Sequence, residues 1–389
     1  MLEREMDGTA VASVRPRAVS RLSRRTRAVA GRLTPADRRI LGLWIGAHAA
    51  LAVTAWMSAW IDGERGLYGP LLGVYGQWDF DWYEAIAAHG YFSGRGPSPD
   101  GYAFLPGEPF ALAAAHLLLR QWIVSGLLVS LIAGGVALVC IGRLGGERAA
   151  LYMLTAPAAM YLMVGYSESL FLAFALPAWM AAKRRDWPTA ALLAALAGLV
   201  RVNGLFLIAA LVLAAATSEH GGRRLRAVAV TSAAAIGPGF CELYLRLGSG
   251  SWTAWLTANK EGWGLHFVGP WRSLTDTWNM AFGHVLTPVR APMFQVEIAC
   301  MGAGVALTIA LAWRRAWPEA LYCGLMFAAL GTTTYYQSVP RALLISWPLY
   351  LLLAKASERR PWIGQAYLWV SVPLAVLVAV YFLLGQWAA

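Results

Sequence analysis

Long apolar segments separated by short polar turns follow one another along most of the chain. A membrane-spanning helix needs about 20 predominantly apolar residues, with a range of roughly 17–25. The segments that approach or reach this length, if the shorter ones are extended at their ends, are 40–61, 122–142, 149–165, 168–182, 188–200, 203–217, 226–246, 296–313, 317–332, 341–355 and 362–386. The pattern therefore predicts an all-α polytopic membrane protein with about eleven transmembrane helices.

One further apolar segment, 104–119, does not fit a simple spanning helix. Near its start, residues 105–109 contain two prolines, a glycine and a glutamate, which oppose a continuous helix. We predict that this segment lies along the outer membrane surface or re-enters it, and a true crossing is the alternative.

The composition agrees with a membrane protein. Hydrophobic residues make up 58% of the chain and charged residues 14%, against about 25% charged residues in soluble domains. These proportions exclude a disordered, collagen-like or disulfide-rich secreted chain. The four cysteines lie in apolar segments and form no CxxC pair, so we expect them to be packing residues.

Positive charge is concentrated at the start of the chain and in a few turns. Nine arginines lie between Arg15 and Arg39, and we interpret 1–33 as a disordered basic cytoplasmic tail preceding one membrane domain, 34–389. Thr34, followed by Pro35 and an aspartate two residues later, predicts a helix start. The other basic clusters are 143–148, 183–185, 223–226, 314–315 and 355–360. The positive-inside rule places all of them in the cytoplasm with the N-terminus, provided that 104–119 does not cross.

With this topology, five polar segments emerge together on the extracytoplasmic side. They are the first outer loop 62–121, residues 165–169, residues 201–204, the Trp-rich loop 247–295 and residues 335–341. Nearly all the chemically unusual residues lie in these segments, which indicates a single outward-facing site. We interpret the Trp-rich loop as a semi-mobile lid on the membrane interface.

The first outer loop combines carboxylates with aromatic side chains. Its candidate residues are Trp78, Asp79, Asp81, Tyr83 and His89. A carboxylate can take a proton from an attacking hydroxyl, and aromatic rings can stack on a sugar, so the combination suits sugar chemistry. Alternatively, the aromatic residues form an interfacial belt and the acids are merely solvated. The Asp-x-Asp pair could also chelate Mg²⁺ or Mn²⁺, although the sequence fixes no cofactor.

Four polar residues interrupt or border apolar segments, where charges are costly and usually functional. Arg201 and Arg341 can match a lipid-linked phosphate with the guanidinium fork. Asn203 can hydrogen-bond a sugar hydroxyl, and Glu168 can position one. The alternatives are that Glu168 and Arg201 pair with each other, that Arg341 anchors a helix end, and that Asn203 caps a helix.

Five motifs, in order over about residues 74–350, resemble the PIG-V-like mannosyltransferases, which are membrane glycosyltransferases of the GT-C class. The motifs are Trp78-Asp79 with Trp82-Tyr83 and His89-Gly90-Tyr91, Ala103-Phe104-Leu105-Pro106-Gly107, Tyr166-Ser167-Glu168-Ser169-Leu170-Phe171, Arg201-Val202-Asn203-Gly204, and Ser338-Val339-Pro340-Arg341 leading into Trp347-Pro348-Leu349. The resemblance implies a GT-C fold with juxtamembrane helices in the first extracytoplasmic loop. It also implies a polyprenyl-phosphate sugar as donor, a catalytic acid at Asp79 and inversion at the anomeric carbon. Eukaryotic members extend a glycosylphosphatidylinositol precursor.

Arginine is strongly preferred over lysine, with only three lysines among 32 basic residues, which favours a GC-rich bacterial genome. A bacterial member would be a plasma-membrane mannosyltransferase that acts on a lipid or lipoglycan acceptor. Asp79 would be the general base and Arg201 and Arg341 the phosphate ligands, and no nucleic acid would be bound. The alternatives are a GT-C transferase of another polyprenyl-phosphate sugar, a lipid or sugar transporter or flippase, and a catalytically inactive scaffold. We find neither an internal repeat nor polar residues gathered at mid-depth, as transporters often have.

Overall fold

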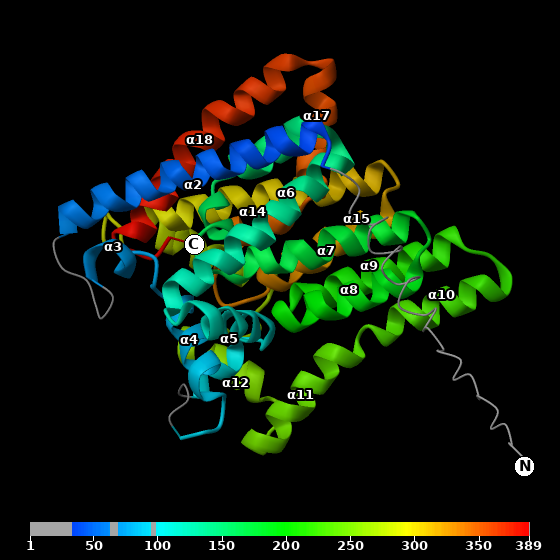
Figure 1. The fold of residues 1–389 in the computed structure, drawn as a ribbon, viewed down its shortest axis with the longest axis horizontal. Coiled ribbons are helices and arrows are strands. Elements are labelled where there is room, and N and C mark those ends of the chain that lie inside the picture. Colours follow the sequence, from blue (N-terminus) through cyan, green and yellow to red (C-terminus); the bar gives the residue numbers. More distant parts are fainter. Residues whose placement is uncertain (1–32, 63–68, 95–98, 389) are drawn as a thin grey trace, which may run out of the picture.

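The computed structural model describes residues 33–62, 69–94 and 99–388, and nearly all of these residues belong to helices (Figure 1). The predicted tail 1–33 lies outside them apart from its last residue. The α-helices are α2 (Pro35–Asp62), α3 (Gly69–Gly73), α4 (Asp79–His89), α5 (Gly107–Leu119), α6 (Trp122–Leu154), α7 (Ser167–Lys183), α8 (Trp187–Val200), α9 (Asn203–Ser218), α10 (Gly221–Ala233), α11 (Ile236–Ser249), α12 (Ala254–Trp263), α13 (Pro270–Phe282), α14 (Ala291–Trp313), α15 (Trp317–Leu330), α16 (Val339–Ile345), α17 (Pro348–Arg359) and α18 (Pro361–Leu383). Two 3₁₀ turns, Pro99–Ala103 and Ala159–Leu162, complete the helical structure.

Five helical stretches of the described chain are long and apolar enough to cross a membrane. They are Pro35–Trp60, Trp122–Leu154, Gly221–Ser249, Ala291–Trp313 and Pro361–Leu383. A sixth span results if α16 and α17, which are bent by 66° at their junction, are counted together. Exposed tryptophans such as Trp56, Trp313 and Trp369 coat the outer faces of these helices. The protein is therefore a multi-pass membrane protein, and the number of eleven spans stays a prediction.

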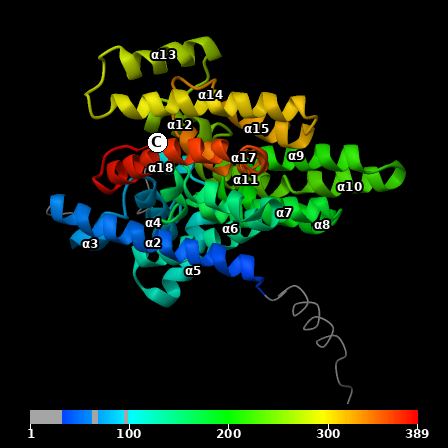
Figure 2. The same ribbon diagram turned by 90° about the horizontal axis from the view of Figure 1, so that it is seen from above.

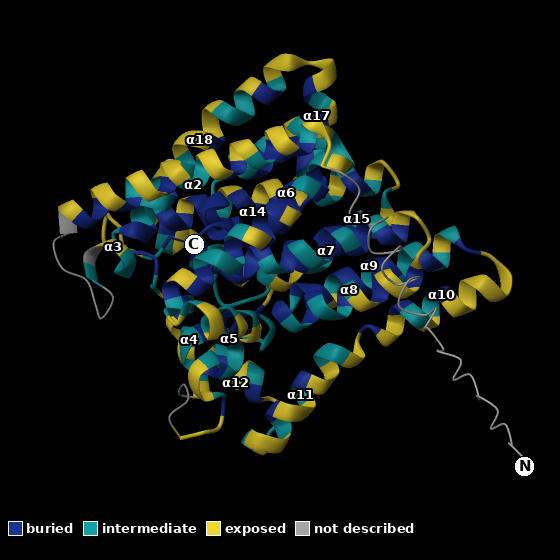
Figure 3. Cartoon of the chain, viewed as in Figure 1, coloured by how far each residue is buried: buried dark blue, intermediate teal, exposed yellow. Residues whose placement is uncertain are grey.

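The centre of the molecule is formed by helices shorter than a bilayer. The helix α8 has 14 residues, which at about 1.5 Å per residue is less than the roughly 30 Å of a hydrocarbon core. Alanines on α7 and α8, including Ala178 and Ala194, are completely buried. Such small side chains allow helix backbones to approach closely. Figure 3 shows buried positions concentrated in α7 and α8, whereas α2 and α18 carry exposed residues along their outer faces.

The predicted helix start at Thr34 is confirmed. The helix α2 begins at Pro35, and the Asp37 amide donates to the Thr34 hydroxyl at 3.1 Å. In return, the Asp37 carboxylate accepts from the Thr34 amide at 2.9 Å, so two otherwise unpaired amides are satisfied. The same carboxylate forms an ion pair with Arg143 on α6, which joins the beginning of α2 to the middle of α6.

The prediction of a helix over 149–165 is wrong. The helix α6 changes direction at Gly146 (φ 79°), continues only to Leu154, and is followed by a 3₁₀ turn and irregular chain as far as Ser167. Pro157 interrupts helical hydrogen bonding in this segment, and most of its residues are buried. Irregular backbone at membrane depth is tolerated where protein surrounds it. An apolar run alone cannot distinguish this arrangement from a spanning helix.

Two further predicted segments also differ in detail. The single helix expected over 341–355 is broken into α16 and α17, because Pro348 begins a new helix after the bend. The Trp-rich loop 247–295 contains two helices, α12 and α13, and α13 packs against α14 (Figure 2). The first outer loop likewise contains α3, α4 and α5. The hydropathy pattern did not predict α12 and α13, whereas helices in the first outer loop were expected from the family resemblance.

The helices place the basic turns and the predicted site at different ends of the molecule. In Figure 1, the turns from α9 to α10 and from α14 to α15 lie at the right. The helices α4, α5 and α12 lie toward the lower left. Because α7 and α9 begin at the site and end at basic turns, the two groups are separated by the length of these helices.

Candidate active site

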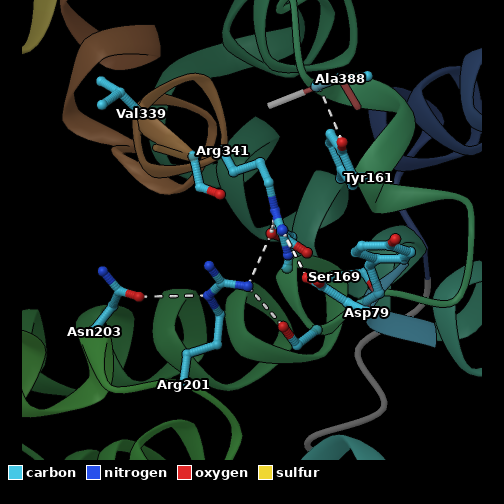
Figure 4. Close-up of polar contacts among 12 residues, drawn as sticks. Asp79, Tyr161, Ser169, Arg201, Asn203, Val339, Arg341 and Ala388 are labelled. Carbon is cyan, nitrogen blue, oxygen red and sulfur yellow. Dashed lines mark hydrogen bonds and ion pairs between the residues drawn. The ribbon is translucent and has the colours of Figure 1, made fainter. Parts of the chain in front are cut away.

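Four segments that are distant in sequence bring charged side chains together at the ends of helices. Asp79 is the first residue of α4, Glu168 lies in the first turn of α7, Arg201 precedes α9, and Arg341 belongs to α16. Figure 4 shows Arg201 and Arg341 reaching from different segments toward the same group of acceptors. The structure thus brings together charged residues from four of the five segments that the sequence placed on one face.

The charges alternate in sign along a chain of direct contacts. Arg341 Nη1 contacts Asp79 Oδ2 at 2.7 Å, and Arg341 Nε donates to Glu168 Oε1. Arg201 Nη1 contacts the same Glu168 oxygen at 2.8 Å. Glu168 and Arg201 therefore do pair, in agreement with one sequence-based alternative, but Arg341 joins them as a third member. Because one oxygen of Glu168 contacts both arginines, this completely buried carboxylate bridges the two guanidinium groups.

Hydrogen bonds to uncharged side chains fix the orientation of Arg201. Its Nη1 donates to the Ser167 hydroxyl at 2.7 Å, and its Nε donates to Asn203 Oδ1 at 3.4 Å. The Tyr83 hydroxyl donates to Ser167 Oγ at 3.1 Å and so connects α4 to this group. The Asn203 side chain contacts Arg201 and does not cap α9, whose first turn has no capping hydrogen bond from a side chain.

Two tyrosine rings pack against the Arg341 guanidinium. The guanidinium carbon lies 4.7 Å from the ring centre of Tyr161 and 5.1 Å from that of Tyr166. Cation–π contacts of this kind are worth about 2 kcal/mol when they are desolvated. The Tyr161 hydroxyl is held by the Ala388 carbonyl at 3.1 Å (Figure 4). Arg341 is thus a buried, multiply held group, and it is not an anchor exposed at a helix end.

Glu297 is a positioning residue that sequence reasoning missed. It is completely buried in α14, and its two carboxylate oxygens accept from the backbone amides of Ser338 at 2.9 Å and Val339 at 2.8 Å. Ser338 adopts the left-handed conformation (φ 62°) as the chain enters α16, which carries Arg341. The signal in the sequence was an acid inside an apolar segment, a feature that is costly and therefore usually functional.

A cavity of 190 Å³ lies beside the ion chain. Its lining combines predicted site residues with several that the sequence did not single out: Asp79, Tyr83, Ala103, Phe104, Leu105, Ser167, Val200, Arg201, Val202, Asn203, Trp255, Asn259 and Arg341. We call this space the reaction cavity. It exposes one carboxylate and two guanidinium groups to the same small volume, which suits a reaction that moves a proton and releases an anion.

Four predicted site residues do not line the reaction cavity, and one of them, the buried Glu168, contacts the two arginines that do. Asp81 and His89 are exposed on α4, and Trp78 lines a different cavity. The Asp-x-Asp pair is therefore divided, because successive helix positions face different directions. Within the residues that the structure describes, no group of three or more His, Cys, Asp or Glu side chains is arranged to hold a metal ion.

Glu108 is a second buried acid close to the ion chain. It begins α5, is only 1% exposed, and neither carboxylate oxygen has a hydrogen-bond partner among the described residues. Burial raises the pKa of this carboxyl well above its ordinary value; the Glu168 carboxylate adds to the rise, and Arg201 opposes it. The raised pKa favours the neutral form of Glu108, which is buried in protein and does not sit at a wet interface.

Replacing Glu108 with glutamine is expected to stabilise the protein increasingly as the pH rises above 5. The folded state holds the Glu108 proton while the unfolded state, with a pKa near 4.5, releases it. Wild-type stability should therefore fall by about 1.4 kcal/mol per pH unit until the folded pKa is reached. Melting temperatures of both proteins in detergent between pH 4 and 8 test this. A difference that does not change with pH would contradict it.

Comparison with known proteins gives partial matches. No protein-family model matches the chain. It is similar to GPI alpha-1,6-mannosyltransferase 2 of Mus musculus, with 34% identity over 155 residues that cover 35% of this chain and 30% of the mouse protein. The Homo sapiens protein of the same name is 36% identical over 155 residues, with the same shares. The chain thus matches less than a third of the length of these curated relatives.

Proposed function

We propose that the protein is an inverting mannosyltransferase of the GT-C class, a bacterial plasma-membrane enzyme. It moves mannose from a polyprenyl-phosphate donor to a lipid or lipoglycan acceptor on the extracytoplasmic face. The observation that carries this proposal is the reaction cavity, which Asp79 lines together with Arg201 and with Arg341, its ion-pair partner. The similarity to GPI mannosyltransferases supports the sugar and the membrane setting.

In this proposal Asp79 is the general base. The acceptor hydroxyl forms a bond to the anomeric carbon as the bond from that carbon to the phosphate oxygen breaks, and Asp79 takes the hydroxyl proton. The neighbouring Arg341 guanidinium contacts the Asp79 carboxylate at 2.7 Å and holds it in place at the cavity. General base catalysis is typically worth about 100- to 10,000-fold in rate.

The two arginines receive the negative charge that develops on the leaving phosphate. Arg201 and Arg341 share the Glu168 carboxylate, and Arg341 also contacts Asp79. Once Asp79 has taken the hydroxyl proton, only Glu168 offsets the two positive charges. Guanidinium groups bind phosphate through paired hydrogen bonds in a fixed geometry. Because Ser167, Asn203 and the tyrosine rings already hold these groups, little reorganisation is needed when the charge forms.

The donor sugar is tested by supplying one labelled polyprenyl-phosphate sugar at a time to membranes that contain the protein. We expect mannose to be transferred to a lipid fraction, and galactose or arabinose not to be. Transfer of another sugar in place of mannose would identify a different GT-C transferase. Transport of the labelled lipid without any new glycosidic product would instead favour a flippase.

The orientation of the site is tested by cysteine labelling. The four native cysteines are buried, and Ala88 on α4 and Arg184 after α7 are exposed. We expect Ala88→Cys to react with a membrane-impermeant maleimide on intact cells and Arg184→Cys to react only after permeabilisation, because basic turns stay in the cytoplasm. The reverse pattern would contradict an extracytoplasmic site.

A further inference from the structure

A second, larger cavity lies on the other side of Trp78. Its volume is 380 Å³, within the range of about 300–1,000 Å³ that is usual for small-molecule sites. Five of its ten lining residues are aromatic: Trp78, Trp263, Phe294, Tyr335 and Trp387. We call this space the aromatic chamber. No residue that lines it is acidic, and Arg290 is its one charged side chain.

Two residues of the aromatic chamber have direct neighbours that line the reaction cavity. Trp78 lines the chamber and is followed directly by Asp79, which lines the reaction cavity. Trp263 lines the chamber, and its ring lies 5.5 Å from that of Phe104, which lines the reaction cavity. A molecule in the chamber would therefore approach Asp79 from a side lined by neither Arg201 nor Arg341.

One uncharged amide side chain, that of Gln337, lines the chamber. Its oxygen is buried against protein, whereas its amide nitrogen is not among the buried groups without a partner. The amide nitrogen can donate a hydrogen bond to a ligand hydroxyl.

We propose that the aromatic chamber binds the pyranose unit of the glycolipid acceptor, an inference that rests on the proposed transferase function. A pyranose presents C–H faces to aromatic rings, whose faces carry negative charge density, and hydroxyls to the Gln337 amide. In a single displacement the nucleophile must approach the anomeric carbon opposite to the leaving phosphate. The proposal therefore places the donor phosphate on the arginines of the reaction cavity and the acceptor sugar in the chamber, next to Trp78 and so beside Asp79.

The ring contacts in the chamber support a rigid sugar platform. The rings of Phe294 and Trp387 lie 5.0 Å apart, and those of Phe294 and Tyr335 lie 6.0 Å apart. The Tyr335 hydroxyl donates to the Trp263 carbonyl at 2.8 Å, which joins two sides of the chamber. Rings that are already held in place lose little conformational freedom when a ligand binds.

The test measures sugar binding without catalysis. Wild-type protein in lipid nanodiscs is mixed with hexyl α-D-mannopyranoside, and saturation transfer from the protein to the sugar protons is recorded. We expect Trp387→Ala and Gln337→Leu each to weaken binding by about tenfold, since each removes an interaction worth roughly 1–1.5 kcal/mol. Trp271→Ala, which removes an exposed ring of α13 outside the chamber, is the matched control and should bind as wild type does.

A transfer assay separates this proposal from the proposed function. The assay uses polyprenyl-phosphate mannose as donor and hexyl mannoside as acceptor. The chamber variants should form less disaccharide, relative to the mannose released by hydrolysis, than wild type does. Their total donor consumption should stay within about threefold of the wild-type value. Equal hexyl mannoside binding in both chamber variants and wild type, or no binding to wild type, overturns the chamber proposal. Chamber-dependent binding without any donor consumption upholds the chamber and overturns the transferase.

Discussion

Replacing Asp79 with asparagine is expected to lower the rate of mannosyl transfer by about 100- to 10,000-fold, because the amide cannot take the proton of the acceptor hydroxyl. The protein should still fold. Asparagine has nearly the same shape, and its carbonyl oxygen can still accept from Arg341, which also keeps its contact with Glu168. The measurement is the initial transfer rate in detergent, with the melting temperature recorded for each protein.

The neighbouring acid of the Asp-x-Asp pair provides the comparison. Asp81 is exposed and lies outside the reaction cavity, so Asp81→Asn should lower the rate far less than Asp79→Asn does. Near-normal transfer by Asp79→Asn would refute its role as base. Equal large losses in both variants would point instead to shared metal binding by the pair.

Replacing Arg341 is expected to have the largest effect on stability. Arg341→Met leaves Asp79 without this ion pair and leaves Glu168 with Arg201 alone. Removing one partner of a buried ion pair typically costs about 3–5 kcal/mol. We therefore expect a clearly lower melting temperature, and loss of transfer even in the fraction that folds.

The lysine variant separates charge from geometry. Arg341→Lys keeps the positive charge, but an ammonium group lacks the planar fork through which Arg341 contacts both Asp79 and Glu168. Loss of one hydrogen bond to a charged group, about 1.5–3 kcal/mol, corresponds to about 10- to 150-fold in rate. Arg360→Lys, at an exposed helix end, is the control and should behave as wild type. A fully active Arg341→Lys protein would show that the fork is not needed.

The sequence predicted the charged part of the site well because charges in apolar surroundings are rare and costly. Asp79, Arg201, Asn203 and Arg341 line one cavity, and Glu168 joins the two arginines behind it. The positive-inside rule assigns the segments that carry these residues to one face of the membrane from Lys and Arg counts alone. Asp81 and His89 were expected to contact the sugar or a metal, but both are exposed on α4 and lie outside the reaction cavity.

What the sequence could not predict concerns backbone irregularity and contacts between distant segments. The segment 149–165 is apolar because it is buried in protein, and its hydropathy resembles that of a lipid-facing helix. Glu297 is an acid inside an apolar segment, but its contacts are with the backbone of Ser338 and Val339, 41 and 42 residues away, so no local pattern reveals what it binds. The contacts of the Tyr161 and Tyr166 rings with Arg341 could not be predicted, because they too join distant segments.

The stereochemistry of the product tests the central claim most directly. Purified wild-type protein is supplied with β-linked mannosyl phosphopolyprenol and host membrane lipids, and the anomeric configuration of the new glycosidic bond is determined by NMR. The account predicts an α-linked mannose, because Asp79 deprotonates an acceptor that attacks opposite to the phosphate held by Arg201 and Arg341. A β-linked product, which requires two displacements, or the absence of any mannosylated lipid would contradict it.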